Sequence, residues 1–246
     1  MKALLTVLLL VAAEASGNAM FDGGETLDFN LSWARISGGS ARMTIAPLDS
    51  ERYRITSVGK SGPFFSRFFK VRDEIESIVS RPTFSTLQFH KRLDERGRKK
   101  DELTVVDPRT RTAVRKGEEI EVPSPVRDPL SLIYYIRTLD LLPGKIFEFD
   151  IIADGKLYTV HAHVIGRQTV TTPAGTFPCL IVEPKMGSAA GVFRDDQNRL
   201  LVWYSDDARR LPVRIRSDVR IGSITATLRS VEKGVASTEP VTQRWQ

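Results

Sequence analysis

A single segment, residues 127–144, predicts a helix, whereas the sequence on both sides of it alternates as strands do. Asp128 can cap its start, Pro129 suits the first helical position, and Pro143 followed by Gly144 ends it. Apolar residues recur three and four positions apart, and further apolar residues occupy the opposite side. A helix that is apolar nearly all round has to be buried. We therefore expect a buried helix over 129–142, with a large antiparallel sheet curled around it.

The rest of the chain predicts strands. Apolar and polar residues alternate over 27–33 and 41–45, and Asp154 followed by Gly155 is a two-residue hairpin signal. Runs of this kind recur to give about a dozen strands, without a change in composition that would mark a second domain. The expected fold class is mainly β, a curved antiparallel sheet (barrel or half-barrel) wrapped around one central α-helix. The expected parts are a signal peptide over 1–19, a single β-barrel-like domain over 20–233 and a disordered tail over 234–246.

The N-terminus has the features of a secretory signal peptide. Lys2 supplies a positive charge, residues 3–13 form an apolar run, and small residues allow cleavage after Ala15 or after Ala19. The run is far shorter than the roughly 20 residues that span a bilayer, so we expect no transmembrane segment in the mature chain. The sequence therefore predicts export, with the periplasm as the compartment.

The net charge of +6 suggests anionic neighbours. In an exported protein these would be lipid headgroups, lipopolysaccharide phosphates or wall polymers, and the compartment disfavours nucleic acid. A solvated basic face that only keeps the protein soluble is the alternative. Cys179 is the one cysteine, so it cannot form an internal disulfide, and its apolar strand predicts a small core residue.

Residues 61–70 depart from the strand pattern. They contain four phenylalanines at helical spacing, Phe64, Phe65, Phe68 and Phe69, with Arg67 and Lys70 beside them. One interpretation is a short helical turn or loop packed over the end of the barrel. The other is an apolar lip with basic edges, which could admit a fatty ligand or touch a membrane surface.

Arginines concentrate near the C-terminal end of the sequence, at Arg209, Arg210, Arg214, Arg216 and Arg220. Three of them share one face of a predicted strand. They form either a solvated outer face or a site where guanidinium groups bind a phosphate or carboxylate headgroup. His161 and His163 also share a strand face, but His90 is the only further histidine, so we predict neither a metal site nor a cofactor.

Reaction chemistry is not visible in the sequence. It contains no nucleophile elbow, zinc-protease, phosphate-loop or dinucleotide-binding motif. The acidic pairs at Asp195-Asp196 and Asp206-Asp207 suit turns. We therefore expect a protein that is not an enzyme, and a hydrolase of wall glycan or lipid is the third choice.

Several motifs together resemble the bacterial envelope family catalogued as domain of unknown function 3108. They are Gly24-Glu25-x-Leu27, Trp33, Gly39, Asp128-Pro129-Leu130-Ser131, Tyr134-Tyr135-Ile136-Arg137, Thr172-Pro173-Ala174-Gly175-Thr176-Phe177, Trp203-Tyr204-Ser205-Asp206-Asp207 and Arg210-Leu211-Pro212-Val213. The resemblance covers nearly the whole mature chain. It implies an exported, mostly β protein without an assigned activity, and it transfers no catalytic residues. The expected fold is also similar in outline to periplasmic lipoprotein carriers, although fold alone does not fix function.

The leading hypothesis is a periplasmic carrier that holds an acyl chain or lipid-like ligand in a cavity between helix and sheet. The candidate apolar contacts are Phe64, Phe65, Phe68, Phe69, Ile133, Tyr134, Ile136 and Trp203, and the candidate headgroup contacts are Arg209, Arg210, Arg214 and Arg216. The alternative is a structural or interaction protein without a ligand cavity, which docks to envelope partners through its basic face.

Overall fold

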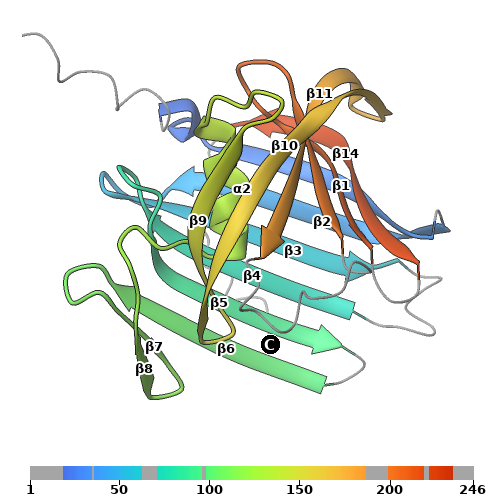
Figure 1. Ribbon diagram of the computed structural model, residues 1–246. Coiled ribbons are helices and arrows are strands. Elements are labelled where there is room, and N and C mark those ends of the chain that lie inside the picture. Colours follow the sequence, from blue (N-terminus) through green and yellow to red (C-terminus); the bar gives the residue numbers. More distant parts are fainter. Residues whose placement is uncertain are drawn as a thin grey trace, which may run out of the picture.

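The computed structural model describes residues 19–34, 36–62, 71–95, 98–186, 199–218 and 222–234. Its strands form one 14-stranded antiparallel sheet in the order β8-β7-β6-β5-β4-β3-β2-β1-β14-β13-β12-β11-β10-β9 (Figure 1). The first seven strands are β1 (Glu25–Trp33), β2 (Ile36–Pro47), β3 (Arg52–Ser61), β4 (Val71–Ser80), β5 (Thr86–Glu95), β6 (Arg98–Asp107) and β7 (Thr112–Arg115). The others are β8 (Glu118–Glu121), β9 (Ile146–Ala153), β10 (Lys156–Thr172), β11 (Gly175–Met186), β12 (Leu200–Ser205), β13 (Pro212–Asp218) and β14 (Ser223–Lys233).

The alternation in the sequence sets the two faces of the sheet. In β1, Leu27 and Phe29 lie in the core, whereas Asp28 between them faces the other side and binds Arg42 across the strand pair at 2.8 Å. Phe29 stands opposite Ala41 of β2, which continues the same face onto the next strand. We call the face that contains Leu27 and Phe29 the inner face, and the opposite one the outer face.

The predicted hairpin turn at Asp154-Gly155 is present. It joins β9 to β10, and the two residues have φ angles of 52° and 73°. Positive φ at both central positions is what a tight turn between twisted strands requires, and aspartate and glycine adopt it most readily.

The helix is shorter than the predicted span of 129–142. The α-helix α2 covers Pro129–Tyr135, and a single 3-10 turn, η2 (Ile136–Thr138), follows it. Leu139 then has an extended backbone, with φ −92° and ψ 154°, and Leu142 is 47% exposed. Pro143 explains part of the difference, because a proline disfavours helical geometry in the residue before it. The expectation that the segment is buried throughout is therefore wrong at its C-terminal end.

The sheet curls so that α2 lies between two arms, one formed by β9–β12 and the other by β2–β6 (Figure 1). The sheet is not closed, because its edge strands β8 and β9 do not pair with each other. A short segment before the helix lies between the arms instead. The N–H of Thr86 in β5 donates to Val126 at 2.8 Å, and the N–H of Arg127 donates to Asp150 of β9 at 3.0 Å. The fold is therefore an open, barrel-like sheet rather than a barrel.

Two apolar clusters fill the space around α2. One joins Leu130 and Tyr134 to core residues of β1–β5 and of β10–β14, together with Phe21 of the 3-10 turn η1 (Ala19–Phe21). The other joins Leu132 and Ile136 to β9–β12. The short helix therefore packs against both arms of the sheet.

Candidate ligand-binding site

Asp128 anchors the start of α2. Its carboxylate is fully buried and accepts four hydrogen bonds, which satisfy both oxygens. One oxygen accepts from the hydroxyls of Ser77 in β4 and Thr86 in β5, at 2.5 and 2.6 Å. The other accepts from the N–H groups of Leu130 and Ser131, both at 2.9 Å. One side chain thus caps the helix and ties it to the sheet.

Arg137 anchors the other end of the helical segment. Its guanidinium makes two contacts with the Glu25 carboxylate, at 2.5 and 3.0 Å, and donates to the backbone carbonyl of Arg209. Both charged side chains are buried, and the guanidinium also lies 5.0 Å from the centre of the Phe21 ring. A paired and hydrogen-bonded geometry of this kind is what allows two charges to be buried. The segment is therefore held at both ends by buried polar contacts.

Two buried tyrosines border the helix. The hydroxyl of Tyr204 in β12 donates to the carbonyl of Ile133 at 3.1 Å. Burial raises the pKa of Tyr204 and of Tyr134 well above the ordinary range. Both phenols therefore stay neutral at physiological pH, and neither is poised for acid–base chemistry.

The predicted apolar contacts fall into three groups. Ile133, Tyr134 and Ile136 all lie on the helical segment, but Tyr134 is buried in one apolar cluster and Ile136 in the other, and Ile133 is half-buried. Trp203 is buried in the cluster that contains Tyr134, but its indole N–H donates to Gln168 of β10 at 2.7 Å, and the Arg214 guanidinium lies 5.8 Å from its ring centre. Its neighbour Tyr204 is the residue that contacts the helix. Phe64, Phe65, Phe68 and Phe69 lie outside the described residues.

A row of apolar residues crosses the inner face, and its members could not be grouped from the sequence. Six residues stand opposite one another on the successive strands β10, β11, β12, β13, β14 and β1, and we call them the inner row. They are Val164, Val182, Val202, Ile215, Ala226 and Leu31. The three valines are buried in the cluster that contains Leu132 and Ile136. Ile215, Ala226 and Leu31 are half-buried. The row therefore starts in the packed core and continues onto a part of the inner face that side chains cover incompletely.

Gly59 lies near this part of the inner face. It stands opposite Ala41 in the register of β2 and β3, and Ala41 in turn stands opposite Phe29. A Cβ atom built on Gly59 would meet no atom of the described chain within 4 Å. The half-buried side chains and this open position together make the region a candidate binding surface for an apolar ligand.

The predicted headgroup arginines do not converge on one point. Arg209 pairs with Asp207 at 2.7 Å and Arg210 with Asp206 at 2.9 Å. The carboxylate of Asp206 is partly desolvated, but Arg210 and Arg167 outweigh this effect and hold its pKa below the ordinary value. Arg216 pairs with Asp218 at 2.8 Å. Three of the four candidate arginines therefore already bind an aspartate. Arg214 is the one that packs on Trp203.

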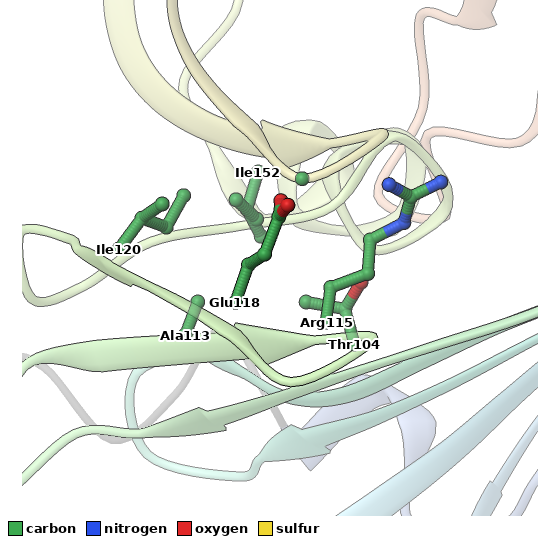
Figure 2. A pocket seen from close by; sticks show the side chains of 7 residues that line it. Thr104, Ala113, Arg115, Glu118, Ile120 and Ile152 are labelled. Atoms are coloured by element: carbon green, nitrogen blue, oxygen red, sulfur yellow. The ribbon is translucent and has the colours of Figure 1, made fainter.

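A small cavity lies between the β6–β8 sheet edge and β9, far from the inner row. It has a volume of about 10 Å³, and Glu118, Arg115 and Ile152 are among its lining residues (Figure 2). That volume holds about one water molecule. Beside the cavity, Arg115 binds Glu102 at 2.8 Å. Burial alone would raise the pKa of Glu102, but Arg115, Lys91 and Lys116 together lower it. The size of the cavity rules out an acyl chain there.

His161 and His163, the histidine pair noted in the sequence, both lie on β10. Glu148 binds His161 at 3.0 Å. Within the described ranges, no group of three or more His, Cys, Asp or Glu side chains could hold a metal ion. In the same ranges, every helix is too short or too polar to cross a bilayer.

A family model described as a protein of unknown function (DUF3108) matches residues 28–229. The chain therefore belongs to this family, which confirms the resemblance seen in the sequence. No curated protein matches.

One solved structure supports the architecture. A β-barrel-like protein of domain of unknown function DUF1849 from Brucella abortus is similar with a TM-score of 0.62 and 10% identity, over 86% of this chain and 98% of that one. A hypothetical protein from Chlamydia trachomatis has a TM-score of 0.40 and 10% identity, over 91% and 94% of the two chains. A protein provisionally assigned as a lipoprotein from Parabacteroides distasonis has a TM-score of 0.33 and 13% identity, over 86% and 95%. The first likeness shows a shared fold alone, and the other two carry no argument.

Proposed function

We propose that the protein is an exported, non-enzymatic binding module of the bacterial envelope that holds an acyl chain or lipid-like ligand. The ligand would lie against the half-buried end of the inner row, formed by Ile215, Ala226 and Leu31. The observation that carries the proposal is the change along this row from buried to half-buried apolar side chains, next to the open position at Gly59. The apolar run of residues 3–13 supports export to the periplasm.

The energetics favour such a ligand. Each fully buried methylene contributes about 0.8 kcal/mol, so a chain with about fourteen methylenes removed from water would gain about 11 kcal/mol before ordering costs. Micromolar affinity requires about 8 kcal/mol. An acyl chain can therefore bind usefully even when its headgroup makes few contacts, which agrees with the arginines already paired to aspartates.

A pair of glycine variants tests the proposal. Gly59 and Gly166 both have open space at the Cβ position, and neither has a positive φ angle. Gly166 stands opposite Ile181, which in turn stands opposite Trp203, so it shares the outer face. Gly59→Leu should fill the proposed ligand space, and Gly166→Leu is the matched control on the other face.

Binding is measured with a soluble fluorescent fatty acid and with native mass spectrometry of the purified mature protein. We expect Gly59→Leu to weaken fatty-acid binding about tenfold or more, because the added side chain competes for the apolar surface, while Gly166→Leu binds as the wild type does. Two results would overturn the proposal: a wild type that binds neither fatty acid nor co-purified lipid, or equal affinities for the two variants. The interaction-protein alternative would then stand, with salt-sensitive association with envelope fractions as its own test.

A further inference from the structure

Three large apolar residues lie exposed together at one end of the inner face. Ile36, Trp33 and Ile224 stand directly opposite one another on β2, β1 and β14, and we call them the apolar rim. They are 58%, 37% and 48% exposed. Isolated exposed apolar residues are common, but three in register on adjacent strands form a continuous patch, which usually marks an interaction surface.

The rim continues the inner row. Trp33 lies two residues beyond Leu31 on β1, and Ile224 lies two residues before Ala226 on β14. Residues two apart on a strand share a face, so the rim and the half-buried end of the row form one apolar surface. The rim is the exposed end of that surface, where a ligand would enter or leave.

The backbone holds the rim in place. Ala34 follows Trp33 with a positive φ of 47°, and its N–H donates to the carbonyl of Ser223 at 2.9 Å. The turn of β1 is thereby tied to the start of β14. On the outer face at the same end, Lys60 and Arg72 stand opposite each other on β3 and β4, and both are exposed. Lys60 and Arg72 thus lie at the same end of the sheet as the rim but on its other face, where they can meet anionic headgroups when that end rests on a bilayer.

We propose that the apolar rim docks on the surface of a phospholipid bilayer, at the end of the site where the ligand is exchanged. The role in ligand exchange rests on the proposed function, but docking of the rim on a bilayer can be tested separately. The side chains of Trp33, Ile36 and Ile224 enter the interfacial layer, and the net charge of +6 favours anionic lipids. The occupant is a bilayer rather than a second protein, because the surface joins an apolar row that suits an acyl chain.

Vesicle flotation tests the docking surface with two double variants of the mature protein. Ile36→Ser with Ile224→Ser removes the aliphatic part of the rim and keeps Trp33. The control is Leu103→Ser with Val105→Ser, two residues on β6 that are 42% and 45% exposed and so have similar exposure. Vesicles contain phosphatidylethanolamine with phosphatidylglycerol, or phosphatidylcholine alone.

We expect the wild type and the β6 control to float with the anionic vesicles, and the rim variant to partition about tenfold less. Weaker partition to phosphatidylcholine would show that charge contributes. The inference fails if the rim variant partitions as the wild type does, if both double variants lose binding equally, or if the wild type does not bind vesicles.

Two further measurements keep the outcomes separate. Sedimentation without vesicles reports whether a second copy covers the rim, and a wild-type dimer that the rim variant converts to a monomer would overturn the inference. Soluble fatty-acid binding reports the site itself. A rim variant that loses vesicle binding but keeps fatty-acid binding supports both statements. A wild type that binds vesicles but not fatty acid supports the docking surface and removes the proposed function.

Discussion

The two ends of the inner row show how one sheet face can serve as core and as surface. At one end Val164, Val182 and Val202 are buried against the helical segment. At the other end Ile215 and Leu31 belong to the same pattern of alternation but are half-buried. The residue types are alike, so the difference comes from what covers them. Leu132 and Ile136 of the helical segment belong to the cluster of the three valines, and Ile215 is only partly buried against that cluster.

Under the proposed function, the buried end of the row stabilises the fold, and the half-buried end is the part that a ligand would contact. Four substitutions test this difference, in order of decreasing expected effect.

Asp128→Ala should cost the most. It leaves the hydroxyls of Ser77 and Thr86 and the first helical N–H groups without their acceptor, and we expect a loss of about 3 kcal/mol or more in the free energy of unfolding. Denaturant unfolding measures it. Asp128→Asn keeps one acceptor oxygen and should lose less. A loss under about 1 kcal/mol for the alanine variant would show that the helix does not depend on this anchor.

Val202→Ala probes the packed end. The side chain is 3% exposed, and its removal leaves a cavity against Leu132 and Ile136, so we expect a loss of about 2 kcal/mol. Fatty-acid binding should stay unchanged, because the residue lies beneath the helix. If the free energy of fatty-acid binding falls by more than the free energy of unfolding does, then the ligand contacts the packed end of the row and not the half-buried end.

Ile215→Ala probes the open end at the residue directly opposite Val202. Since Ile215 is only half-buried, unfolding should become easier by about 1 kcal/mol, less than for Val202→Ala. Binding of the fluorescent fatty acid should weaken several-fold. Equal stability losses in the two variants, with unchanged binding, would erase the distinction between the ends.

Asp28→Asn probes the outer face and should have the smallest effect. The hydrogen bond from Arg42 lowers the pKa of Asp28 below its ordinary 3.8, against the opposing effect of burial. A carboxyl with a lowered folded pKa stabilises the fold above its unfolded pKa, and that contribution disappears as the pH falls through the folded pKa. Arg42 is 57% exposed, so the contribution at pH 7 should be below about 1 kcal/mol. The difference between variant and wild type in urea unfolding should shrink towards pH 3, and a constant difference would contradict the assignment.

Local signals in the sequence predicted most of the fold. The alternation around Leu27 and Phe29, the turn at Asp154-Gly155 and the cap at Asp128 each depend on a few neighbouring residues. The length of the helix depended on more than its apolar spacing. Extended backbone at Leu139 places Leu141 in the core and Leu142 largely in solvent, which a helical pattern over the segment does not anticipate.

The candidate site was harder to predict because it depends on register between distant strands. Leu31, Ala226 and Ile215 come together only through the pairing of β1 with β14 and of β14 with β13. Alternation identified Leu31 as an inner residue but could not name its neighbours. For Trp203 the sequence could not predict which face of the sheet its side chain lies on. Its strand is apolar on both faces, so the sequence could not say that Tyr204 rather than Trp203 meets the helix.

The pairing of β1 with β14 also determines when the chain can finish folding. Glu25 stands opposite Lys233, so the first and last strands of the sheet are neighbours near its middle. Contacts between such distant parts of a sequence form late and slow the folding reaction. A nascent chain that still lacks its final strand leaves one edge of β1 unpaired and the centre of the sheet incomplete. The native state therefore becomes available only when synthesis has reached the last strand, which is compatible with a polypeptide that crosses a membrane before it folds.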